Sequence, residues 1–104
     1  MVTSKPNHIA VAKIAGRADT AAQGGLVYQA LEEALARTGP VVVDFDGINT
    51  ATSSFTNLSF VRLLSTRKLR EIKKRLRVVN STRQINDMIK SRLEREGGDG
   101  KAVA

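Results

Sequence analysis

The stretch VVVDFDGINTATSSFTNLSF, residues 41–60, decides the fold. Its run of valines, without alternation of apolar and polar residues, predicts a central strand over 41–45 that is buried on both faces. Residues 46–52 are polar and include Gly47, which indicates a turn. Ser53 or Ser54 then caps a helix, since a short side-chain oxygen can accept a hydrogen bond from a first-turn N–H. Apolar residues spaced by three carry this helix to about Arg67.

The residues before this stretch predict one more strand and one more helix. Residues 8–15 are rich in β-branched residues and predict a strand. Asp19 or Thr20 can cap a helix that runs to Arg37, with Gly24-Gly25 weakening its first turns or delaying its start. Gly39-Pro40 ends the helix, because glycine accepts a left-handed turn and proline cannot continue the hydrogen-bond ladder.

The residues after the stretch repeat the pattern. Residues 69–74 form a connector that can hold a helical turn. Residues 75–80 alternate charged and apolar side chains before a valine pair, which predicts a third strand nearer the sheet edge. Residues 80–82 offer the next helix cap, and apolar residues at helical spacing indicate a third helix to about Glu96.

The predicted order is therefore βαβαβα, which is typical of an α/β fold with a mixed or mostly parallel sheet packed with helices. We expect one small domain over residues 8–96, a flexible arm over 1–7 and a flexible tail over 97–104. Aromatic residues make up only 4% of the 104-residue chain, which predicts an aliphatic core.

Composition limits the classes of function. The chain has no cysteine, which excludes disulfides and thiolate metal sites. The N-terminus lacks an apolar signal core, and no stretch approaches the length of a membrane span, so we expect a cytoplasmic protein that does not contact a membrane.

The net charge of +7 is unevenly placed. Residues 62–95 carry twelve basic and three acidic side chains, whereas residues 1–61 carry four basic and five acidic ones. One interpretation is a nucleic-acid contact. The other is a solvated, solubilising face, which the absence of interleaved aromatic residues for base stacking favours. The residues of this candidate contact are Arg67, Lys68, Arg70, Lys73, Lys74, Arg75 and Arg77.

Signals for catalysis are weak. The single histidine, His8, has no candidate partner near it in sequence and is interpreted as a surface residue. Asp44 and Asp46 could hold Mg²⁺, but we expect one of them to order the turn by accepting from backbone N–H groups. No Gly-rich phosphate loop is present. The sequence thus predicts no enzyme, no cofactor and no bound metal.

Residues 41–60 resemble the strand-loop-helix signature of STAS domains, the fold of anti-sigma-factor antagonists. They resemble still more the STAS-like domains of unknown function of bacteria and phages, in which a strand ending in Asp-Phe precedes a Gly-Val/Ile turn and a Ser-rich loop. The matching positions are Asp44-Phe45, Gly47-Ile48, Ser53-Ser54 and Phe55. Residues 75–80 are similar to the next strand of that branch, and Arg17 to its entry into the first helix. The resemblance spans about residues 9–93.

The resemblance implies a regulatory role. In anti-sigma-factor antagonists the loop reads Asp-Ser-Ser/Thr-Gly and a partner kinase phosphorylates the first serine, which corresponds to Ser53. Thr52 stands in place of the acidic residue, and Phe55 in place of the glycine. The implied partner is a histidine-kinase-like ATPase or a transcription regulator. The alternative is that the serine only caps the helix.

We therefore expect a non-enzymatic signalling module that docks the region 46–60 onto a protein. Ser53 is the candidate phosphorylation switch, with Ser54, Thr52 and Asp46 on the same surface. A nucleic-acid-binding module using residues 67–77 is the alternative, and a homodimer formed through an edge strand is a further expectation.

Overall fold

The computed structural model describes residues 7–97, which form one sheet packed with helices. The strands are β1 (His8–Ala10), β2 (Val41–Asp44) and β3 (Leu76–Val79). They pair in the order β1-β2-β3, and both pairings are parallel, so the predicted α/β class with a mostly parallel sheet is confirmed. The valine run is central and the third strand lies at an edge, as predicted.

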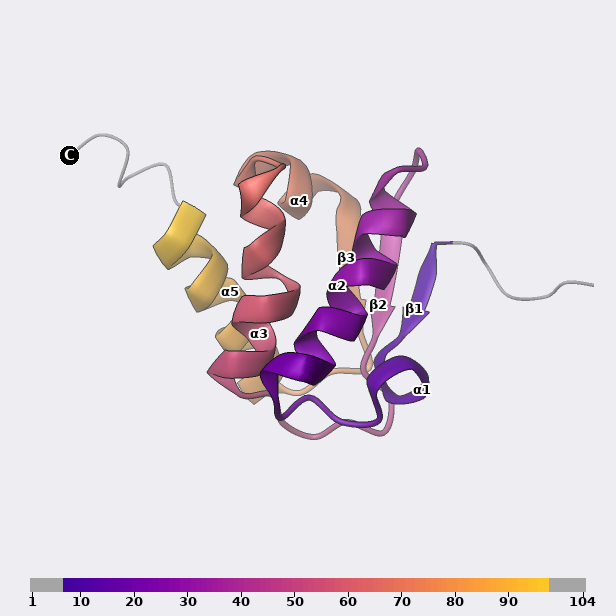
Figure 1. Cartoon of the computed structure of the whole chain (residues 1–104), viewed down its shortest axis with the longest axis vertical. Coiled ribbons are helices and arrows are strands. Elements are labelled where there is room, and N and C mark those ends of the chain that lie inside the picture. Colours follow the sequence, from indigo (N-terminus) through magenta and orange to yellow (C-terminus); the bar gives the residue numbers. More distant parts are fainter. Residues whose placement is uncertain (1–6, 98–104) are drawn as a thin grey trace, which may run out of the picture.

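The helices lie between and after these strands. They are α1 (Val11–Ala15), α2 (Ala21–Leu35), α3 (Ser53–Ser59), the 3₁₀ helix η1 (Val61–Ser65), α4 (Leu69–Arg75) and α5 (Arg83–Gly97). With three parallel strands in sequence order, right-handed crossovers place the connecting helices on the same face of the sheet. Figure 1 shows α2 crossing in front of the strands, α3 beside it and α5 beyond α3.

The two faces of the sheet differ in burial. Ile9, Val41 and Val43 face the helices and are fully buried. Val42 and Asp44 point to the other face and are only half-buried, so the prediction that this strand is buried on both faces is wrong. A sheet wound in one direction receives helices on one side only, which leaves the second face without a packed layer.

The predicted strand over residues 8–15 is wrong beyond Ala10. Ala10 pairs with Asp44, the last residue of β2, so no partner strand continues past that point. The alanine-rich residues that follow instead form α1, which is closed by a hydrogen bond from the Gly16 N–H to the Ala12 carbonyl. A residue with high strand propensity forms a strand only where a neighbouring strand can pair with it, and β2 ends opposite Ala10.

The helix expected from 53 is shorter than predicted, the connector holds more helix than the single turn expected, and Thr20 caps α2 as predicted, without a delayed start at Gly24-Gly25. The helix expected to run from 53 to about 67 breaks into α3 and η1, near the point where the Ser59 hydroxyl donates to the Phe55 carbonyl at 2.8 Å. The connector expected at 69–74 is the helix α4, which leads directly into β3. Gly24 and Gly25 lie inside α2, which starts at Ala21 with Thr20 as its cap.

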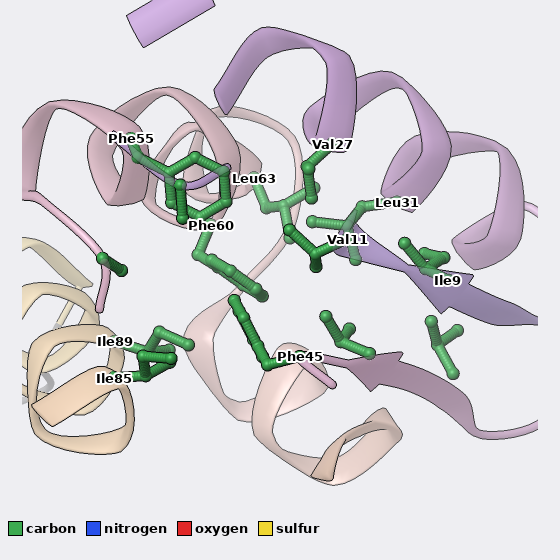
Figure 2. Packing of buried hydrophobic residues seen from close by; sticks show 14 of the residues in the cluster. Ile9, Val11, Val27, Leu31, Phe45, Phe55, Phe60, Leu63, Ile85 and Ile89 are labelled. Carbon is green, nitrogen blue, oxygen red and sulfur yellow. The ribbon is translucent and has the colours of Figure 1, made fainter. Parts of the chain in front are cut away.

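The core is not purely aliphatic, contrary to the prediction from composition. Phe45, Phe55 and Phe60 are fully buried at its centre, and the rings of Phe45 and Phe60 lie 6.3 Å apart between centroids. Figure 2 shows these rings among aliphatic side chains from β1, α2, η1 and α5. A low aromatic content therefore does not exclude an aromatic centre, because all three phenylalanines of the chain lie in the core.

The arm predicted over residues 1–7 and the tail over 97–104 lie outside the described residues, except at their inner ends. Asn7 is not loose: its side-chain amide donates to the Thr38 carbonyl at 3.2 Å and to the Pro40 carbonyl at 3.0 Å. Gly97 is the last residue of α5. In the described part of the chain, no helix has the length and apolar character needed to cross a membrane.

Candidate functional site

Thr52 fixes the start of α3. Its hydroxyl oxygen accepts from the Phe55 N–H at 3.2 Å and its hydroxyl donates to the Asp19 carbonyl at 2.7 Å. Its backbone N–H donates to the Ala18 carbonyl at 3.0 Å. The prediction that Ser53 or Ser54 caps this helix is therefore wrong, because Thr52 occupies the cap position and satisfies the first-turn N–H.

Ser53 and Ser54 are exposed in the first turn of α3. Within residues 7–97, neither hydroxyl takes part in a hydrogen bond with another group of the chain. The next residue, Phe55, is completely buried and anchors the turn in the core. The two serines are thus accessible side chains on a backbone that Thr52 and Phe55 hold in place.

The loop before α3 is held by side chains of the last helix and its cap. The Gln84 side chain accepts from the Ala51 N–H at 2.9 Å and donates to the Ala51 carbonyl at 3.0 Å. The Thr82 hydroxyl donates to the Asn49 carbonyl at 3.0 Å. Ile48 packs into the core, whereas Asp46 is exposed. The loop therefore presents polar groups on an ordered backbone.

A polar depression of about 260 Å³ lies between this loop and the turn before α2. Arg17 and Asp19 line one side of it, with 3.3 Å between the Arg17 Nε and an Asp19 carboxylate oxygen. Asn49 and Thr50 line the other side. Sequence reasoning did not place residues 16–19 at the site, although the resemblance at Arg17 was a signal for it.

Asp44, the last residue of β2, contacts groups from both neighbouring strands on the open face of the sheet: His8, the first residue of β1, and Asn80, which follows β3. One carboxylate oxygen accepts from the Asp46 N–H at 2.9 Å and from the Asn80 side chain at 3.0 Å. The other lies 3.3 Å from Nε2 of His8. The expected turn-ordering role of this pair of aspartates is confirmed for Asp44.

The electrostatics of Asp44 follow from these contacts. The hydrogen bond from Asn80, the N–H of Asp46 and the attraction of His8 lower the pKa of Asp44, although partial burial opposes them. His8 has a partner that its sequence neighbours did not reveal, because the sheet brings it beside β2. The described residues contain no group of three or more His, Asp or Glu side chains placed to hold a metal ion.

The seven residues of the basic segment do not form one uniform contact. Arg75 donates to the carbonyls of Leu35 at 3.0 Å, Gly39 at 2.9 Å and Arg37, and so caps the end of α2. Arg67 pairs with Glu32 at 2.8 Å. The residues of this segment that are exposed are Lys68, Arg70, Lys73, Lys74 and Arg77.

Glu32 of α2 is the centre of a polar cluster with Tyr28, Thr66 and Arg67. Partial burial alone would raise the pKa of Glu32, but hydrogen bonds from Arg67, Tyr28 and Thr66 together with the Arg67 charge lower it. Burial, followed by the hydrogen bond with Glu32, raises the pKa of Tyr28. The Arg62 guanidinium lies 4.1 Å from the Tyr28 ring centroid. This cluster fastens η1 to α2 and explains why Arg67 is half-buried.

Comparison with known proteins gives one family. The model of the STAS-like domain of unknown function (DUF4325) matches residues 23–86, which include β2, the loop, α3 and β3. No curated protein matches the chain, and no solved structure does.

Proposed function

The chain belongs to the family of STAS-like domains of unknown function, and from this membership and the geometry of its loop we propose that it is a non-enzymatic regulatory module. It binds a protein partner in the cytoplasm through a docking surface formed by residues 46–54, a shorter region than the expected 46–60, because Phe55, Thr56, Ser59 and Phe60 are buried in the core. The observation that carries the proposal is the pair of exposed serine hydroxyls beside a capped and anchored helix start.

The ordered backbone of the loop supports a docking role. Thr52, Gln84 and Thr82 already hold the loop through side-chain hydrogen bonds, so a partner does not need to order it on binding. The nearby depression is polar, unlike the mostly apolar pockets that bury small molecules. A polar surface on a rigid base suits a protein partner of ordinary interface composition.

Phosphorylation of Ser53 is the proposed switch. A phosphate would add a charge of about −1.5 to −2 to this surface. The two departures from the antagonist motif do not remove the exposed serine. Threonine caps a helix as aspartate does, and here Thr52 keeps that role. Phe55, in place of glycine, points into the core rather than over Ser53.

By the resemblance to anti-sigma-factor antagonists, the partner is a histidine-kinase-like ATPase or a transcription regulator. The basic residues of α4 and β3 define the competing function. Lys74 and Arg77 are exposed and could contact phosphates. They provide the matched control for the test, because they lie on elements outside the docking surface.

The test is site-specific photocrosslinking in the native cell. The full chain carries p-benzoylphenylalanine in place of Ser54 in one sample and in place of Lys74 in the other. We expect a discrete protein adduct from position 54 alone, retained in Ser53→Ala and lost in Ser53→Asp. Equal adducts from Ser53→Ala and Ser53→Asp would refute the switch, and absence of an adduct from position 54 would refute the docking surface.

A salt titration with DNA and RNA addresses the competing function. Binding through phosphates should weaken linearly in log K with log salt. If nucleic acid binds with such a slope, and Lys74→Glu with Arg77→Glu abolishes it, the nucleic-acid function replaces the one proposed.

A further inference from the structure

An apolar groove of about 310 Å³ lies between α4, β3 and α5, and none of the residues that line it belongs to the docking surface of residues 46–54. Lys73, Lys90, Asn86 and Glu94 contribute its polar groups. Leu76 and Val78 of the edge strand are only half-buried there. The aliphatic side chains that line the groove are Leu69, Ile72, Leu76, Val78, Ile89 and Leu93.

The groove runs beside an unpaired edge of the sheet. The Val79 carbonyl accepts from the Phe45 N–H at 3.0 Å, so the backbone groups of Val79 point toward β2. Alternate residues of a strand direct their backbone groups to opposite sides, so the N–H and carbonyl of Val78 point away from β2. Within the described residues, neither group of Val78 has a hydrogen-bond partner. A strand added here would place alternate side chains in the groove.

The charge around the groove favours an acidic occupant. Residues 69–97, which comprise α4, β3 and α5, carry nine basic and four acidic side chains. Glu94 on the rim is already paired with Lys73 at 3.4 Å, whereas Lys90 is exposed. With Lys73 and Glu94 paired, Lys90 leaves the lining of the groove with one net positive charge, in a segment that is basic as a whole, and this charge beside an apolar floor favours an apolar segment that carries carboxylates.

We propose that this groove binds an extended acidic segment of another protein, which pairs with β3 as a fourth strand. A second copy of the chain would bring two segments with the same net positive charge together across a two-fold axis, which like charge disfavours. Neither residues 1–6, with one lysine and no acidic side chain, nor residues 98–104, with one lysine and one aspartate, carry an excess of acidic side chains.

The experiment is an NMR titration of the ¹⁵N-labelled full chain with a peptide in which valine alternates with threonine and a run of glutamates flanks this core at each end, where the carboxylates can reach the rim of the groove. Main-chain pairing supplies most of the affinity in strand addition, so a generic sequence is a sufficient probe. We expect saturable shifts at Val78, Asn80 and Lys90, and binding at least about tenfold weaker for the matched peptide with lysines in place of the glutamates. No shifts up to about 1 mM peptide, or equal binding of both peptides, would overturn the proposal.

Variants locate the site. Lys90→Glu should weaken binding about threefold or more, whereas Lys74→Glu, the same charge change on an exposed residue that does not line the groove, should change it less than about twofold. Val78→Pro should abolish binding and preserve the fold, because the N–H it removes is not paired. If Val78→Pro unfolds the domain, the two lysine variants decide.

Two results would show that the peptide binds in another way than as an added strand. Equal weakening by Lys90→Glu and Lys74→Glu would indicate attraction to net charge alone. Helical carbon shifts in the bound peptide would indicate a helix in the groove rather than a strand. Either result refutes strand addition, and neither bears on crosslinking from position 54.

Discussion

Replacing Gly24 with alanine tests the close contact between α2 and α3 that positions the docking surface. A β-carbon on Gly24 would lie 2.5 Å from the Phe55 carbonyl oxygen and 3.0 Å from the β-carbon of Leu58. The first atom belongs to the backbone of α3, so it cannot yield by a change of rotamer. The two helices, which lie side by side in Figure 1, would have to separate.

The expected magnitude follows from two opposing effects. Alanine inside a helix is more stable than glycine by about 1 kcal/mol. Overpacking a close contact costs about 1–3 kcal/mol, and a backbone atom at 2.5 Å places Gly24→Ala at the upper end of that range. We therefore expect Gly24→Ala to lower the free energy of unfolding by about 1–2 kcal/mol.

The adjacent glycine is the matched control. A β-carbon on Gly25 would meet no atom within 4 Å, so only the gain in helix propensity remains. We expect Gly25→Ala to raise the free energy of unfolding by about 0.5–1 kcal/mol. The same chemical change at two neighbouring positions should thus have opposite signs.

Urea unfolding followed by circular dichroism at 222 nm measures both variants. Thermal unfolding gives a second measure, because in a domain of this size a change of about 1 kcal/mol in the free energy of unfolding shifts Tm by about 4–8 °C. Unchanged denaturant slopes would show that the stability of the native state is being compared. The reasoning is refuted if Gly24→Ala is as stable as Gly25→Ala, since the helices would then have room for a methyl group.

Two further predictions concern the residues around the loop. Thr52→Ala should lower the free energy of unfolding by about 1–2 kcal/mol through loss of the helix cap, whereas Ser53→Ala should change it by less than about 0.5 kcal/mol; a larger loss in Ser53→Ala by urea unfolding would contradict the cap assignment. Because contacts lower the pKa of Asp44 in the folded state, its carboxylate contributes stability above the unfolded pKa of about 4, and this is lost as pH falls through the folded pKa. Asp44→Asn should therefore be less stable than the wild type by about 1 kcal/mol at pH 7, with a gap that closes as the pH falls below the unfolded pKa of about 4; an equal gap at pH 7 and in acid would contradict the argument.

The sequence predicted correctly those features that depend on contacts between residues close together in the chain. The valine run predicted a central strand, and Thr20 and Thr82 were within the segments expected to cap α2 and α5. Helix caps depend on atoms two or three residues away, so spacing reveals them. The same reasoning found the strand-loop-helix region but placed its cap one or two residues too late, because Thr52, Ser53 and Ser54 are all suitable caps.

Long-range contacts could not be read from spacing. Arg75 lies in a basic run, yet its guanidinium caps a helix that ends 40 residues earlier in the chain. His8 meets Asp44 only because β1 pairs with β2. The length of β1 depends on where β2 ends, so its own β-branched residues predicted too long a strand. Each of these errors arises from a partner distant in sequence.

The helix α5 takes part in both surfaces, and its geometry allows them to be tested separately. Gln84 in its first turn holds the docking loop, whereas Leu93 near its other end lines the groove. Lys90, the groove residue changed in the titration, lies six residues after Gln84, about 9 Å along the helix axis. That separation is about one Debye length at physiological salt, and Gln84 itself carries no charge, so a charge change at Lys90 acts only weakly on the loop. A change at Lys90 that alters peptide binding should therefore leave crosslinking from position 54 intact, unless the whole helix moves.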